Sequence, residues 1–109
     1  MTLTVPMDVY DAPTEMVIVL PLGGVQKDSV ILTCKNKTLY IAWERQKPVL
    51  KDSLTPLQEQ CFWWIFEKEV MLPENAAFDR IYSELSPENI LTIVVPKIVV
   101  PEEIIVKKL

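Results

Sequence analysis

Histidine is absent from the 109 residues, and cysteine and glycine occur only twice each. Because general acid–base catalysis near neutral pH most often uses histidine, its absence removes the commonest catalytic side chain. Cys34 and Cys61 form no CxxC pair, and no histidine is present to complete a usual zinc set with them. We therefore expect no metal site and no cofactor, and we interpret the two thiols as small apolar packing groups rather than redox centres.

An excess of basic charge is also lacking. The chain has 15 acidic and 11 basic residues, a net charge of −4, and its Lys and Arg residues are scattered. A face that follows the phosphates of a nucleic acid is therefore not expected. No run approaches the roughly 18 apolar residues of a membrane span, and the start, MTLTVPMDVY, lacks the basic and apolar regions of a secretory signal. The expected location is the cytoplasm.

Catalytic sequence motifs are missing as well. The chain contains no GxSxG and no GxxxxGK[ST] motif, and its GGV is not a GxGxxG before a helix. Pairs of carboxylates such as Glu67 with Glu69, or Glu102 with Glu103, lie where solvated strand faces and tails normally carry charge. We therefore predict that the protein is not an enzyme.

Strand signals dominate what is present. Half of the residues are apolar and 24% are charged, as in a folded single domain. Short β-branched and aromatic runs between Pro, Gly, Asn and Asp predict strands at 8–10, 15–22, 29–35, 38–44, 61–72 and 90–95, with one helical turn within 73–81. This spacing predicts an all-β fold, an antiparallel immunoglobulin-like β-sandwich of about seven to eight strands.

Turn residues refine this prediction. Asn36 and Lys37 are expected to connect a β-hairpin, and Asn89 can adopt a left-handed conformation. The two-residue period of the second hairpin strand separates one face (Leu39, Ile41, Trp43) from the other (Tyr40, Ala42, Glu44).

Residues 61–66, CFWWIF, are the most unusual stretch. A strand here would place Phe62, Trp64 and Phe66 on one face and Cys61, Trp63 and Ile65 on the other. One sheet face cannot hide both sets. Either the polar, proline-containing loop at 46–60 shields the second set, or that set contacts another subunit or a bound protein. We favour the contact, because adjacent tryptophans are common in binding hot spots.

The order of motifs from Pro6 to Lys97 resembles the α-crystallin domain of small heat-shock proteins. The matching residues are Leu20, Pro21 and Val25 of the first long turn; Leu39, Ile41, Glu44 and Arg45 of the hairpin; Phe66, Leu72 and Pro73; and Leu91, Ile93, Val95, Pro96 and Lys97 of ENILTIVVPK. Lys68 stands where the family usually has Arg, and Trp43 and Asn89 stand where it usually has Gly. Lysine lacks the bidentate geometry of arginine.

The resemblance implies an arm at 1–7, shorter than the family's usual arm, a domain at 8–97 and a tail at 98–109. It also implies a homodimer in which residues 46–60 pair with the partner's sheet, with contacts from Val49, Leu50, Leu54, Leu57 and Lys68. An ordinary folded-back loop is the alternative. In the tail, Ile98 with Val100 and Ile104 with Val106 match the family's docking triplet, and the second pair is favoured for reach. Alternatively, the tail is a last strand of its own domain.

The resemblance implies an ATP-independent chaperone that binds partly unfolded client proteins through exposed apolar surface and prevents their aggregation. Phe62, Trp63 and Trp64 are the expected client or subunit contacts. Its partners would be unfolded clients and further copies of itself, as a dimer or a larger homo-oligomer. The alternative is a co-chaperone or adaptor module of the CS-domain kind that binds one specific protein.

Overall fold

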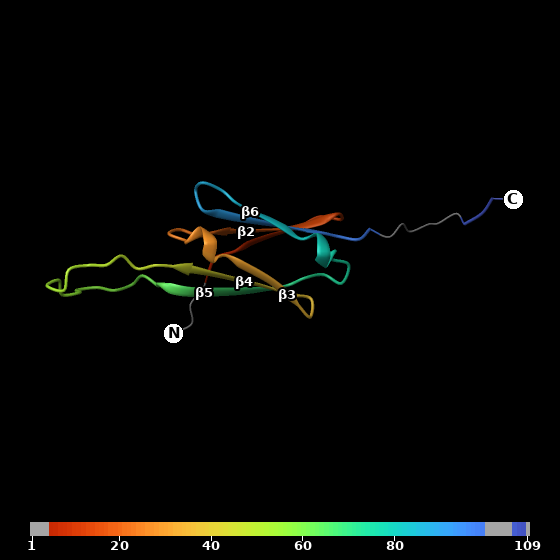
Figure 1. The fold of residues 1–109 in the computed structure, drawn as a ribbon. Helices are drawn as coiled ribbons and strands as arrows, with labels where there is room; N and C mark the ends of the chain where they lie inside the picture. The colour runs from red at the N-terminus through yellow and green to blue at the C-terminus, as the bar shows by residue number, and fades with distance from the viewer. Residues whose placement is uncertain (1–4, 100–105, 109) are drawn as a thin grey trace.

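The computed structural model describes residues 5–99 and 106–108. The described chain forms two facing layers of antiparallel strands (Figure 1). Sheet A has the strand order β1-β2-β7-β6 and sheet B the order β3-β4-β5. The strands are β1 (Asp8–Asp11), β2 (Glu15–Pro21), β3 (Ile31–Lys35), β4 (Thr38–Arg45), β5 (Trp64–Met71), β6 (Tyr82–Leu85) and β7 (Ile90–Pro96). The predicted all-β antiparallel sandwich is confirmed.

The core lies between the sheets and is made by alternate residues of the long strands. Its members within the strands are Ile18 and Leu20 of β2, Leu39, Ile41 and Trp43 of β4, Phe66 and Val70 of β5, and Leu91, Ile93 and Val95 of β7. The prediction that Leu39, Ile41 and Trp43 share one face of β4 is therefore confirmed, and that face points into the core. Trp43 stacks on Phe66 with ring centroids 5.5 Å apart, so the two rings pack together between β4 and β5 in the core.

The turns follow the predicted residues. Asn36 and Lys37 both have positive φ, 51° and 62°, as a tight hairpin with the right-handed strand twist requires. Asn89 has a φ of 64° before β7 and confirms the left-handed assignment. Gly24 has a φ of 74°, and a Cβ there would lie 3.3 Å from Cγ of Arg45, so glycine also makes room for that side chain.

Two strand predictions differ from the structure. Strand β6 was not predicted, because this short edge strand, YSEL, exposes three of its four residues and shows no apolar alternation. The strand expected at 61–72 begins only at Trp64, where a φ of 75° breaks the extended conformation. Residues 61–63 therefore belong to the connection from β4. The expected helical turn is a short 3-10 turn at Phe78–Arg80.

Candidate interaction surface

The connection between β4 and β5, residues 46–63, projects beyond the end of the sandwich instead of folding over it (Figure 1). We call it the β4–β5 loop. Its two limbs meet near the root, where Nζ of Lys47 lies 3.7 Å from Oε1 of Glu59. Gln26 Nε2 also donates to Oε1 of Gln46 at 2.7 Å and ties the first limb to the sandwich. The loop is thus anchored at its base and extended at its tip.

The apolar side chains of this loop face solvent. Val49 is 98% exposed and Leu57 97% exposed, and Leu50 and Leu54 each expose more than half of their surface. Several large apolar side chains exposed in one segment are a common feature of interaction sites in proteins. The structure therefore places all four predicted loop contacts in one accessible segment.

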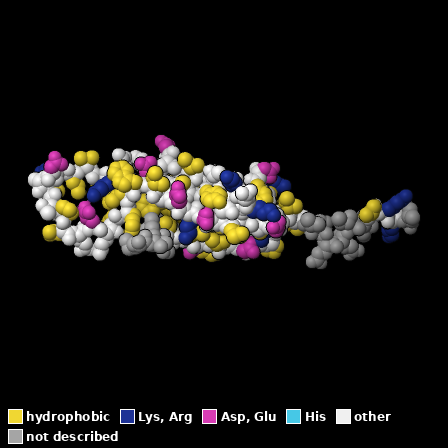
Figure 2. Space-filling model, turned by 90° about the horizontal axis from the view of Figure 1, so that it is seen from below, with side chains coloured by type: hydrophobic (Ala, Val, Ile, Leu, Met, Phe, Trp, Pro, Cys, Tyr) yellow, Lys and Arg dark blue, Asp and Glu magenta, His cyan; other side chains and the backbone are white. Residues whose placement is uncertain are grey.

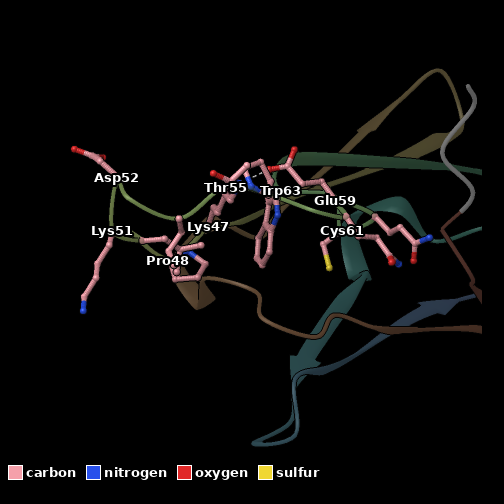
Figure 3. A pocket seen from close by; sticks show the side chains of 13 residues that line it. Lys47, Pro48, Lys51, Asp52, Thr55, Glu59, Cys61 and Trp63 are labelled. Carbon is pink, nitrogen blue, oxygen red and sulfur yellow. Dashed lines mark ion pairs between the residues drawn. The ribbon is translucent and has the colours of Figure 1, made fainter.

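A hollow of about 780 Å³ lies between the limbs of the loop. Figure 3 shows the side chain of Trp63 among the loop residues that line it, near Thr55 and Glu59. Trp63 is only partly exposed as a result. The loop therefore shields one aromatic ring of the CFWWIF run.

The remaining aromatic residues of the run are not arranged as predicted. Phe66 is buried in the core, whereas Trp64 is 54% exposed and Phe62 41% exposed. The expectation that Phe62, Trp64 and Phe66 share one strand face does not hold for Phe62, because β5 begins only at Trp64 and Phe62 lies in the loop before it. Ile65 is also exposed. Among the aromatic residues of the run, the loop thus shields Trp63, whereas Phe62, Trp64 and the neighbouring Ile65 remain exposed near the loop root.

Arg45 positions this root. Its Nε donates to the carbonyl oxygen of Gly23 at 2.7 Å, and its Nη1 donates to that of Phe62 at 3.2 Å. The guanidinium group lies 4.7 Å from the ring centroid of Phe66, a cation–π distance. Sequence reasoning recorded Arg45 only as a matching residue. Its contacts are distant in sequence, and no local pattern indicates them.

Lys68 lies on β5, opposite Ile41 of β4, and is partly buried. It borders a second, shallow recess that includes Tyr40 and Glu67, and it does not line the hollow of the loop. Within one chain, the structure does not bring Lys68 together with the four loop residues. A joint role would require a second subunit.

The predicted tail residues are only partly described. Ile98 is 51% exposed, and its N–H donates to the carbonyl oxygen of Asn75 at 2.7 Å. Val106 is 90% exposed. Val100 and Ile104 lie outside the described residues. Neither described triplet residue belongs to a strand, so the structure gives no support to a last strand there.

Lys97 connects the end of β7 to the start of the sandwich. Its Nζ pairs with Oδ1 of Asp11 and donates to the carbonyl oxygen of Ala12 at 2.8 Å. The Lys97 side chain is only 10% exposed. Lys97, which ends the motif ENILTIVVPK, therefore has a structural role, because its contacts with Asp11 and Ala12 hold the end of the edge strand β1.

Within the described ranges, no group of three or more His, Cys, Asp or Glu residues is arranged to hold a metal ion. No helix there is long and apolar enough to cross a membrane. Both cysteines are free and exposed, so the expected packing of these thiols in apolar surroundings is wrong. Cys34 lies on the edge strand β3 and Cys61 lies in the β4–β5 loop, and neither position is buried on folding.

Two facing antiparallel sheets with an extended loop between β4 and β5 define a β-sandwich domain. The sequence model of the Hsp20/alpha crystallin family matches residues 8–108, and the chain belongs to that family. Proteins of this family are chaperones without enzymatic activity. No curated protein matches the chain by sequence.

Solved structures show the same fold. Heat shock protein 16.0 from Schizosaccharomyces pombe has a TM-score of 0.76 at 21% identity, covering 97% of this chain and 100% of that one. HSP18.5 from E. histolytica has a TM-score of 0.74 at 21% identity, covering 98% of this chain and 100% of that one. A small heat-shock protein from Xylella fastidiosa has a TM-score of 0.74 at 20% identity, covering 97% and 98%. At these identities the likeness concerns the fold.

Proposed function

We propose that the protein is an ATP-independent holdase, which binds apolar segments of partly unfolded proteins and keeps them from aggregating. The observation that carries this proposal is the set of exposed apolar side chains in the β4–β5 loop and at its root, which lie at one end of the sandwich (Figure 1). Family membership supports the same function. Burial of apolar surface, at about 25 cal/mol per Å², supplies the driving force, and no covalent step is needed.

Client contact in this proposal centres on the loop root. Phe62 and Trp64 are accessible in the single chain, and Trp63 becomes accessible if the loop limbs separate. Aromatic side chains of this size supply much apolar area with few rotatable bonds. Holding therefore requires no rearrangement of the sandwich.

Dimer formation through the β4–β5 loop is the second part of the proposal. Fully solvated Val49 and Leu57 gain apolar burial only if another surface covers them. We propose the partner's β1 as the acceptor, because all four of its residues are exposed and it is an edge strand of sheet A. Lys68 then completes the subunit contact from the neighbouring chain.

Docking of the tail is the third part. Val106 is exposed, which suits a segment that adds to a strand edge of a neighbouring subunit. Replacing Ile104 and Val106 with Gly should reduce any assembly larger than a dimer to dimers, as measured by light scattering after size exclusion. An unchanged mass distribution rejects tail docking.

The holdase proposal is tested with a heat-aggregating protein whose light scattering is followed without ATP. Near-stoichiometric amounts of the chain should suppress the scattering. Phe62→Ser with Trp64→Ser should reduce suppression several-fold, whereas Met71→Ser, which alters an exposed residue at the far end of β5, should not. If the folded chain fails to suppress scattering at any ratio, the holdase proposal is wrong and binding of one dedicated protein partner becomes the better account.

A further inference from the structure

The outer face of sheet A carries an ordered set of side chains that the proposed function does not use. Strand register places four residues in one row across the sheet: Tyr10, Val17, Val94 and Tyr82. The next row consists of Asp8, Val19, Thr92 and Glu84. Ile18 and Ile93, which lie between these residues along their strands, are fully buried, so both rows point away from the core.

The two rows differ in chemistry. The first is apolar across all four strands and has a tyrosine at each edge, 58% exposed at Tyr10 and 59% at Tyr82. The second has a carboxylate at each edge, from Asp8 and Glu84. Glu15 is the other charged strand residue on this face, where the four described strands place no Lys or Arg. The face is therefore an apolar strip beside negative charge.

The outer face of sheet B lacks this arrangement. Its central rows are Ile31, Ala42 and Glu67, and Thr33, Tyr40 and Glu69. Each of these rows ends in a glutamate on β5, so no apolar row crosses the whole sheet. Sheet B therefore offers matched control positions with similar exposure and charge.

We propose that the outer face of sheet A binds extended segments of unfolded polypeptide that combine apolar residues with Lys or Arg. This inference rests on the proposed holdase function and assigns it a second site with a charge preference. Four strands about 4.8 Å apart give a row about 14 Å long, which equals about four extended residues. A basic residue at each end of such a segment reaches Asp8 and Glu84. Tyr10 and Tyr82 also offer cation–π contacts.

Charge decides against a second copy of the chain as the occupant. Two such faces packed together would bring the carboxylates of Asp8 and Glu84 near those of the other copy, in a chain whose net charge is already −4. Pairing of a partner strand with β1 uses backbone groups at the edge and leaves the outward side chain of Tyr10 available. The proposed dimer and the proposed site are therefore compatible.

The test uses two fluorescein-labelled, unstructured 16-residue peptides that share two segments of four apolar residues. Each segment is flanked by lysines in one peptide and by glutamates in the other. Fluorescence anisotropy with the full chain at low salt should give at least tenfold tighter binding of the lysine peptide. The difference should shrink at high salt, where screening is stronger. Equal affinity for both peptides overturns the proposal.

Matched variants assign the site. Asp8→Lys with Glu84→Lys should weaken binding of the lysine peptide at least tenfold and strengthen binding of the glutamate peptide. The control, Glu67→Lys with Glu69→Lys on sheet B, should change the affinity for either peptide less than twofold. Tyr10→Ser with Tyr82→Ser should weaken binding of both peptides about fivefold. Tyr40→Ser on sheet B is the control and should leave both affinities unchanged. Circular dichroism and thermal melts verify folding. Equal effects of the sheet A and sheet B charge variants contradict the assignment.

Other occupants give distinct results. If removal of residues 98–109 strengthens peptide binding tenfold, the chain's own tail covers the face and the proposal is wrong. If Tyr82→Ser alone, which leaves β1 unchanged, lowers the solution mass, a second copy covers the face and the proposal is equally wrong. If the chain suppresses aggregation but the charge variants bind like the original, only this inference fails. If the chain neither suppresses aggregation nor binds the peptides, the holdase proposal fails with it.

Discussion

The sandwich and the β4–β5 loop differ in the exposure of their apolar residues to solvent. In β2, β4 and β7, apolar residues alternate with outward side chains, and Ile18, Ile41 and Ile93 are fully buried. In the loop, Val49 and Leu57 are almost fully exposed although the loop continues directly from β4 and into β5 of sheet B. The difference teaches that two roles of apolar residues are separated along the sequence: one region buries apolar surface within the chain, and the other leaves it exposed to solvent.

The largest expected effect on stability comes from the sandwich. Ile41→Ala should lower the free energy of unfolding by about 2–5 kcal/mol, because it leaves a cavity between the sheets. Chemical denaturation at a fixed low protein concentration measures this loss. Val49→Ala in the loop is the control and should change the value by less than about 0.5 kcal/mol. Equal losses in the two variants would show that the loop packs as part of the core.

An intermediate effect is expected where the two regions join. Arg45→Met removes the donors to the carbonyl oxygens of Gly23 and Phe62, and we expect a loss of about 1–2 kcal/mol. Limited proteolysis should also cut the β4–β5 loop faster, since its root is no longer tied. Arg45→Lys keeps the positive charge but lacks the forked donors of the guanidinium group. Its stability and its proteolysis rate should lie between those of the original chain and Arg45→Met. A proteolysis rate equal to that of the original chain contradicts a positioning role for Arg45.

The smallest effect on stability is expected at a turn of the sandwich. Asn89 has a φ of 64°, and alanine tolerates this left-handed backbone conformation less well than asparagine. Asn89→Ala should therefore lower the free energy of unfolding by about 1 kcal/mol or less. Asn89→Gly relieves that restriction and should be neutral within a few tenths of a kcal/mol. Thermal denaturation compares the two variants. A larger loss for Gly than for Ala would indicate that the Asn side chain itself holds the turn.

Much of the sandwich could be predicted from sequence because its residues follow simple periodicities. The alternation of Leu39, Ile41 and Trp43 and the turn at Asn36 both indicate their structure locally. The loop root could not be predicted in the same way. Trp64 has a conformation that bulky residues rarely adopt, and the contacts from Arg45 that hold the neighbouring backbone join positions far apart in sequence.

The outer face of sheet A shows a second kind of limit. Tyr10, Val17, Val94 and Tyr82 form one row only because β7 pairs with both β2 and β6. Single strands reveal which residues share a face, but the row depends on strand order and register across the sheet. Strand β6, which supplies Tyr82, was itself missing from the prediction.

The most direct test of the separation between folding and binding is the solution mass of a chain without residues 48–58. Light scattering after size exclusion should show a dimer or larger assembly for the original chain and a monomer for the deletion, with the thermal melting temperature of the sandwich retained. An unchanged mass with retained folding would contradict the account, because the exposed apolar loop would then have no part in assembly.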